Sequence, residues 1–163
     1  MTVAAGARGA AALAAAVLVV AAPATLAGSP WEAGKAAFEA NCAVCHQASG
    51  AGNAALAPPL LSYPAKYATI PEGRRQLALT VLYGLFGDVV VDGSHYNFKM
   101  PSFVQLDDEA LAATLNYVVF DLAHAPDSVA PVTATEIRNE RVTPKSGAEV
   151  RAHRATVLQA LGL

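Results

Sequence analysis

Both cysteines of the chain lie in the run Cys42-Ala43-Val44-Cys45-His46. This Cys-x-x-Cys-His spacing is the arrangement that attaches a c-type haem. The two thiols can add to the two vinyl groups of one macrocycle, and the imidazole of the next residue then lies beside the iron as an axial ligand. The run therefore predicts one covalently bound haem c, with Cys42 and Cys45 as its attachment points and His46 as its first iron ligand.

Other uses of a cysteine pair fit the sequence less well. In an exported chain two cysteines would ordinarily form one disulfide, but the histidine that follows favours haem attachment. A structural zinc site needs four Cys or His ligands, and the remaining histidines, His95, His124 and His153, contain no closely spaced pair. A thioredoxin-like redox pair follows a strand, whereas the residues before Cys42 have helical periodicity.

Met100 is the candidate for the second axial ligand. It precedes Pro101 in an irregular segment and is the only methionine apart from the initiator. Methionine is most often a filler of hydrophobic cores, but an iron ligated by histidine needs a sixth ligand, and a thioether fills that position in electron-transfer haems. His95, five residues earlier, is the competing ligand and would give a bis-histidine centre of lower potential.

Short helices are expected to position these residues around the cofactor. Periodicity and capping residues predict helices over 30–40, from Pro71 to a stop at Gly87, and from Asp107 to Leu122. The run 89–97 combines Val-Val-Val with Asp-Gly and predicts a small β-hairpin, and the Gly-, Ala- and Pro-rich run 49–59 predicts a loop. The expected fold is all-α, with one hairpin before the methionine segment.

A wall of apolar side chains is expected around the iron, formed by Leu60, Val81, Leu85, Phe103 and Leu115. Such a wall disfavours the extra positive charge of Fe(III), and thioether ligation acts in the same direction. An iron with both axial positions filled exchanges single electrons without binding a substrate. The expected function is therefore a relatively high-potential electron carrier, not an enzyme. A haem enzyme or gas sensor in which Met100 leaves the iron is the alternative.

These residues together resemble the class I c-type cytochromes, in particular small bacterial members with a hairpin before the ligand methionine. The resemblance covers residues 31–122 and rests on four motifs, Gly34-Lys35-Ala36-Ala37-Phe38, Cys42-x-x-Cys45-His46, Pro58-Pro59-Leu60 and Met100-Pro101. It implies the cytochrome c fold around one haem, with Gly34 and Phe38 packed near Tyr117. It also implies that Pro58 and Leu60 belong to the haem site, with the Pro58 carbonyl accepting a hydrogen bond from His46.

Residues 1–27 predict a secretory signal peptide. They contain Arg8, an apolar stretch of 13 residues over 10–22, and small residues up to Ala27, where we expect cleavage. The stretch is shorter than the roughly 20 residues with which a helix crosses a bilayer, which argues against the alternative of an uncleaved anchor. The mature chain would start near Gly28 in an oxidising compartment, the periplasm of a bacterium.

The haem domain is expected to span 28–123 and to be followed by a C-terminal helical extension over 124–163. Capping boxes at Thr133/Glu136 and Ser146/Glu149 predict two helices there. The second helix places four apolar residues on one side, Val150, Val157, Leu158 and Leu161, and Arg151, Arg154 and Gln159 elsewhere. We expect the extension to cover apolar surface of the domain itself, and docking onto a partner subunit is the alternative.

Composition limits the partners. The chain is 54% hydrophobic and 15% charged with a net charge of −2, which excludes a disordered chain and argues against a nucleic-acid partner. The expected partner is a redox protein, either a dehydrogenase donor or a terminal oxidase or reductase acceptor. A permanent electron-transfer subunit of a larger periplasmic oxidoreductase is the alternative to a free carrier.

Four basic residues are candidates for a positive rim at the haem edge or for an ordinary solvated face, Lys66, Arg74, Arg75 and Lys99. Three tyrosines are candidates for hydrogen bonds to the haem propionates or the methionine sulfur, Tyr67, Tyr83 and Tyr96.

Overall fold

A computed structural model describes residues 1–2, 29–54 and 56–163 of the chain. The helices are α1 (Glu32–Asn41), α2 (Ala43–His46), α3 (Tyr63–Ala68), α4 (Pro71–Tyr83), α5 (Asp108–Asn116), the π-helix η1 (Tyr117–Leu122), α6 (Ala134–Arg141) and α7 (Gly147–Leu161). The strands are β1 (Val89–Val91) and β2 (Ser94–Tyr96). The expected all-α fold with one hairpin is confirmed. Residues 3–27 of the predicted signal peptide lie outside the described residues. None of the helices described is long and apolar enough to span a membrane.

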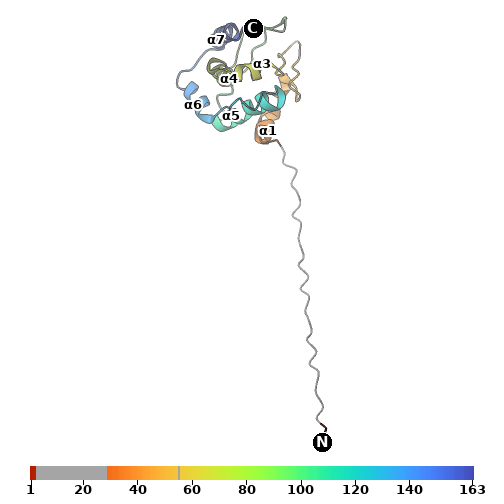
Figure 1. Cartoon of the computed structure of the whole chain (residues 1–163). Coiled ribbons are helices and arrows are strands. Elements are labelled where there is room, and N and C mark those ends of the chain that lie inside the picture. The colour runs from red at the N-terminus through yellow and green to blue at the C-terminus, as the bar shows by residue number, and fades with distance from the viewer. Residues whose placement is uncertain (3–28, 55) are drawn as a thin grey trace.

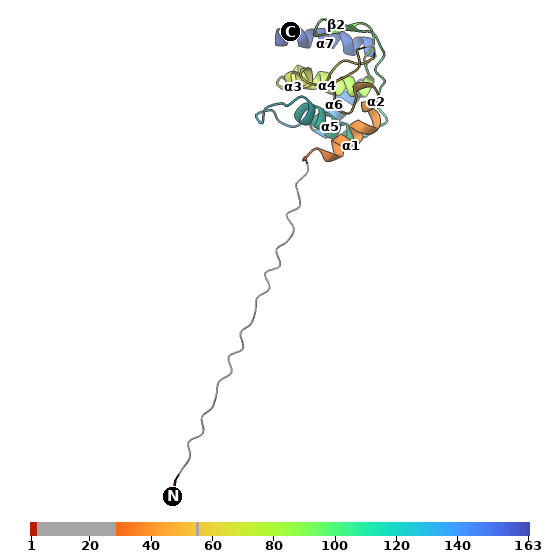
Figure 2. The ribbon, with the colours of Figure 1, turned by 90° about the vertical axis from the view of Figure 1, so that its right-hand side faces the viewer.

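Helix α1 crosses α5 and η1 at close range because Gly34 has no side chain. A Cβ atom at Gly34 would lie 2.0 Å from the carbonyl oxygen of Ala113 and 3.1 Å from the Cβ of Tyr117. One turn later the fully buried ring of Phe38 lies 5.4 Å from the ring of Tyr117. The expected packing of Gly34 and Phe38 near Tyr117 is therefore confirmed, and Figure 2 shows α1 directly beside α5.

We expect Gly34→Ala to lower the free energy of unfolding by about 2 kcal/mol, because the new methyl group meets backbone atoms of α5 that cannot move aside. Alanine's higher helix propensity, worth about 1 kcal/mol, offsets only part of this cost. Chemical denaturation of the full chain measures the change. Ala36→Gly, at an exposed position of the same helix, is the control that isolates propensity. A Gly34→Ala variant more stable than the parent would contradict the close crossing.

Helix α4 ends at Tyr83, four residues before the predicted stop at Gly87. The glycine that ends it is Gly84, which has φ 71° and where a Cβ would lie 2.3 Å from the Met100 carbonyl oxygen. The segment containing Met100 crosses the chain at this point, with hydrogen bonds from Met100 N to Leu85 O (2.8 Å) and from Leu85 N to Met100 O (3.3 Å). The helix therefore ends where the methionine segment needs space.

The hairpin follows the predicted pattern. Val89 pairs with Tyr96 and Val91 with Ser94, around a turn at Asp92-Gly93. Val89 and Val91 are buried while Val90 is 43% exposed, so one face of the hairpin points into the molecule. Helix α5 also begins as predicted, because the Asp107 side chain accepts a hydrogen bond from Ala110 N at 2.6 Å. The predicted helix 107–122 changes to a π-helix for its last six residues.

The C-terminal extension packs on the domain that precedes it. Helix α6 packs against α4 and α5, and α7 packs against α4 and α3, so α4 and α5 lie between α7 and α1 (Figure 1). Ile137, Val150 and Val157 have no exposed surface. Both predicted capping boxes are present. The expectation that the extension covers the domain's own apolar surface is confirmed, whereas the domain boundary after Ala123 stays a prediction.

Candidate functional site

A cavity of about 270 Å³ lies among the helices and the hairpin. All six predicted site residues line it, Cys42, Cys45, His46, Pro58, Leu60 and Met100. The five side chains expected to form an apolar wall also line it, Leu60, Val81, Leu85, Phe103 and Leu115. Residues far apart in sequence are therefore gathered around one largely apolar space.

The cysteine-histidine run forms a tight helical turn. Cys42 directly follows α1, and its carbonyl oxygen accepts hydrogen bonds from Cys45 N (3.1 Å) and His46 N (3.0 Å). Both thiols are free and partly exposed. Burial raises the pKa of the Cys42 thiol to about 11, with a further contribution from the neighbouring Cys45. A redox-active cysteine of the thioredoxin type has a lowered pKa, so the environment of Cys42 differs from that of such a site.

His46 is buried and held in one orientation. Its Nδ1 lies 2.9 Å from the carbonyl oxygen of Pro58, which can only accept, so Nδ1 must carry the hydrogen. The lone pair on Nε2 is then available to bind a metal. Burial lowers the pKa of the imidazole, and the hydrogen bond to Pro58 opposes this in part. The loop that carries Pro58 is fixed by hydrogen bonds from Gly52 N to His46 O (2.9 Å) and from Leu60 N to Gly50 O (2.8 Å).

The Met100 side chain lines the same cavity, and its backbone is fixed on Leu85 as described above. His95, the competing ligand, lies elsewhere. Its side chain is 69% exposed, its Nδ1 lies 2.8 Å from the Asp88 carboxylate, and it does not line the cavity. The structure therefore brings Met100, and not His95, to the space that His46 borders.

The four basic residues have different surroundings, and Lys66 lies with its Nζ 5.3 Å from the centre of the Tyr63 ring. Arg74 and Arg75 pair with Glu136 (2.6 Å) and Glu140 (3.0 Å) of α6, so their charges stabilise the extension. Lys99 lines the cavity. The sequence left a positive rim and an ordinary solvated face both open. The acidic residues of α6 opposite the two arginines argue against the rim for Arg74 and Arg75.

Of the three candidate tyrosines, two line the cavity and one does not. Tyr67 and Tyr96 line the cavity, whereas the Tyr83 hydroxyl donates to the Glu140 carbonyl oxygen at 3.0 Å. His153 of α7 is partly buried, with Nδ1 2.7 Å from the Gln76 side-chain oxygen.

Arg154 was missed as a cavity residue. It comes from α7 and lines the cavity, although the sequence pattern placed it away from the apolar side of that helix. The available signal was its spacing, because Arg154 lies four residues after Val150 and three before Val157, which are both fully buried. Residues three and four apart share one face of a helix.

The donor set fits a covalent haem. Two free thiols can form the thioether bonds, His46 presents one unprotonated nitrogen, and the wall is mostly apolar. The buried Tyr67 hydroxyl also lacks a hydrogen-bond partner among the described residues, as expected where a polar group of a ligand completes the site. No group of three or more His, Cys, Asp or Glu side chains that could hold a metal ion occurs in the part of the chain that the structure describes.

Comparisons with known proteins agree with this chemistry. The family model for cytochrome c matches residues 31–119. Two relatives called cytochrome c-552, both from Thermus thermophilus, are 38% identical over 125 residues. The alignment covers 76% of this chain and 95% and 84% of the two relatives. The chain therefore belongs to the cytochrome c family, as a class I c-type cytochrome that carries electrons on one covalently bound haem c.

Proposed function

We propose that this protein is an exported electron carrier whose iron is ligated by His46 and Met100. The observation that carries the proposal is the shared cavity, which Cys42, Cys45, His46 and Met100 all line. When bound, haem c supplies an iron that gains or loses one electron. In this proposal Cys42 and Cys45 hold the macrocycle, and Pro58 and Leu60 complete the wall on the His46 side.

The protein's contribution is to keep the iron six-coordinate and shielded from water. The hydrogen bond between His46 and Pro58 fixes the imidazole and raises its basicity. The backbone contacts of Met100 with Leu85 restrict the segment that presents the thioether. The apolar wall then favours the less charged Fe(II) state, as thioether ligation does, so we expect a relatively high reduction potential.

The proposed location is the periplasm, supported by the signal-peptide pattern over residues 1–27. A haem domain over 28–123 with an extension over 124–163 is the matching domain organisation. The proposed partners are redox proteins of that compartment, a dehydrogenase as donor or a terminal oxidase or reductase as acceptor.

Visible spectra of the exported holoprotein test the ligation. The oxidised and reduced forms are recorded with and without carbon monoxide. We expect a low-spin haem that stays attached on denaturation, a charge-transfer band from thioether sulfur to Fe(III), and no response to carbon monoxide. A carbon monoxide response of the native protein would contradict the proposal, because it requires an accessible sixth position and favours a haem enzyme or gas sensor.

A further inference from the structure

The cavity wall carries positive charge that the iron ligands do not explain. Lys99 and Arg154 are its cationic side chains, and no Asp or Glu lines it, within the described residues. Lys99 is exposed and can keep its hydration, whereas Arg154 is partly buried. A partly desolvated guanidinium beside an apolar space is stabilised by an anion.

Arg154 is fixed toward the cavity by its place on α7. The fully buried Val150 and Val157 lie on the same face of the helix. Its Nη2 donates to the carbonyl oxygen of Val90 at 3.1 Å, and its guanidinium lies 5.9 Å from the centre of the Tyr63 ring. Both contacts are with neutral groups, and the described residues provide no carboxylate partner for Arg154. Since a guanidinium has five N–H donors, these contacts leave capacity for an anion.

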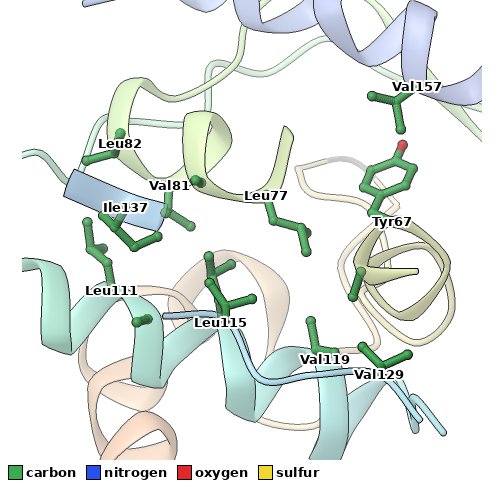
Figure 3. Close-up of a cluster of buried hydrophobic side chains, with 14 residues drawn as sticks. Tyr67, Leu77, Val81, Leu82, Leu111, Leu115, Val119, Val129, Ile137 and Val157 are labelled. Carbon is green, nitrogen blue, oxygen red and sulfur yellow. The ribbon is translucent and has the colours of Figure 1, made fainter. Parts of the chain in front are cut away.

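The Tyr67 hydroxyl is a second donor beside the cavity that could bind an anion. The residue is 7% exposed, and its buried O–H has no hydrogen-bond acceptor among the described residues. The Arg154 guanidinium is close to this hydroxyl but can only donate to it. Figure 3 shows the hydroxyl directed from α3 toward Val157 of α7, the helix that carries Arg154. Burial raises the pKa of this phenol, while the positive charge of Arg154 acts in the opposite direction. A buried O–H without an acceptor is destabilising, so an acceptor is expected here.

We propose that Arg154 and Tyr67 bind a propionate carboxylate of the haem, so that the C-terminal extension contributes directly to the cofactor site. A haem carries two propionates, and either of them could be the anionic acceptor that Arg154 and Tyr67 lack in this cavity. A guanidinium and a phenol both donate to carboxylate oxygens, and the pairing with arginine is charge-assisted. The inference rests on the proposed position of the haem in this cavity, but it does not depend on which residue is the sixth ligand.

Arg154 would act on the iron through the propionate. Its positive charge offsets the negative charge of the carboxylate, which otherwise favours Fe(III). Replacing Arg154 by a neutral residue should therefore lower the reduction potential. The propionate pKa should also rise, because its ionised form loses a partner. The potential of the variant should then fall as pH rises through that pKa, while the potential of the parent protein changes less over the same range.

The test compares Arg154→Gln with Arg151→Gln in the holoprotein. Arg151 lies three residues earlier on α7, is exposed and does not line the cavity, so its loss is a matched change of charge. Potentiometric titrations at several pH values from about pH 5 to pH 9 give the reduction potential of the haem in each variant. At neutral pH we expect the equilibrium constant for reduction to fall about tenfold in Arg154→Gln, or about 59 mV. Arg151→Gln should change it by less than about twofold.

Two more variants keep the test decisive if Arg154→Gln does not mature, that is, if it does not form a folded holoprotein with covalently attached haem. Arg154→Lys keeps the charge and should restore most of the potential, and Tyr67→Phe should lower it by a smaller amount. An unchanged potential in Arg154→Gln, or in Tyr67→Phe when Arg154→Gln does not mature, would overturn the proposal. So would an equal shift in Arg151→Gln, or a loss of stability without a shift in potential. The thioether band in the parent protein separately tests Met100, so the two proposals can fail independently.

Discussion

Met100→Ala is expected to convert the protein from an electron carrier into a haem protein with an open coordination position. The thioether-to-iron charge-transfer band should disappear, and the reduced protein should bind carbon monoxide. The reduction potential should fall by on the order of 0.1–0.3 V, a part of the roughly 0.8 V over which axial ligands set haem potentials. Visible spectra and potentiometric titration of the purified holoprotein measure the three effects.

Met100→His is the control that distinguishes loss of the thioether ligand from structural collapse of the segment around residue 100. Because the backbone of residue 100 is fixed by its two hydrogen bonds with Leu85, an imidazole there should still reach the cavity. We expect this variant to be low-spin and unresponsive to carbon monoxide, with a potential below that of the parent protein. If Met100→Ala keeps the charge-transfer band and the parent potential, Met100 is not the ligand.

Local chemistry explains why so much of the site was predictable from the sequence. The spacing of Cys42, Cys45 and His46 is set by the macrocycle itself, so one short run predicts three of the residues that meet in the cavity. The contact between His46 and Pro58 followed from the family resemblance, and the structure has the two atoms 2.9 Å apart. Helix starts were predictable for a similar reason, since the Asp107 side chain bonds to a nearby backbone N–H.

Features that depend on residues distant in sequence were missed. Gly84 and Gly87 are equally good helix ends by type, and only the approach of the Met100 carbonyl selects Gly84. Helix α3 has six residues, too few for a periodic pattern. Arg154 was placed on the polar side of α7 because a charged residue is usually solvated. The residues that surround Arg154 in the cavity come from distant parts of the chain, and the periodicity of α7 alone does not predict them.

Ile137→Ala is expected to lower the free energy of unfolding by about 3 kcal/mol, within the 2–5 kcal/mol typical of this change in a core. Ile137 belongs to α6 and has no exposed surface. Figure 3 shows it among side chains of α4 and α5, beside Leu82 and Leu111. A loss of this size is a large part of the 5–15 kcal/mol by which domains are stable. Guanidinium denaturation of the holoprotein measures it.

Val142→Ala is the matched control, because Val142 directly follows α6 and is 80% exposed. It should change the free energy of unfolding by less than about 0.5 kcal/mol. Ile137 does not line the cavity, so Ile137→Ala should keep the thioether band and the parent potential at low denaturant. If the extension served mainly to dock a partner, Ile137→Ala would leave stability unchanged and Val142→Ala would slow electron transfer. Stability lost only with Ile137 instead makes the extension an integral part of the hydrophobic core, because Ile137 is buried and Val142 is exposed.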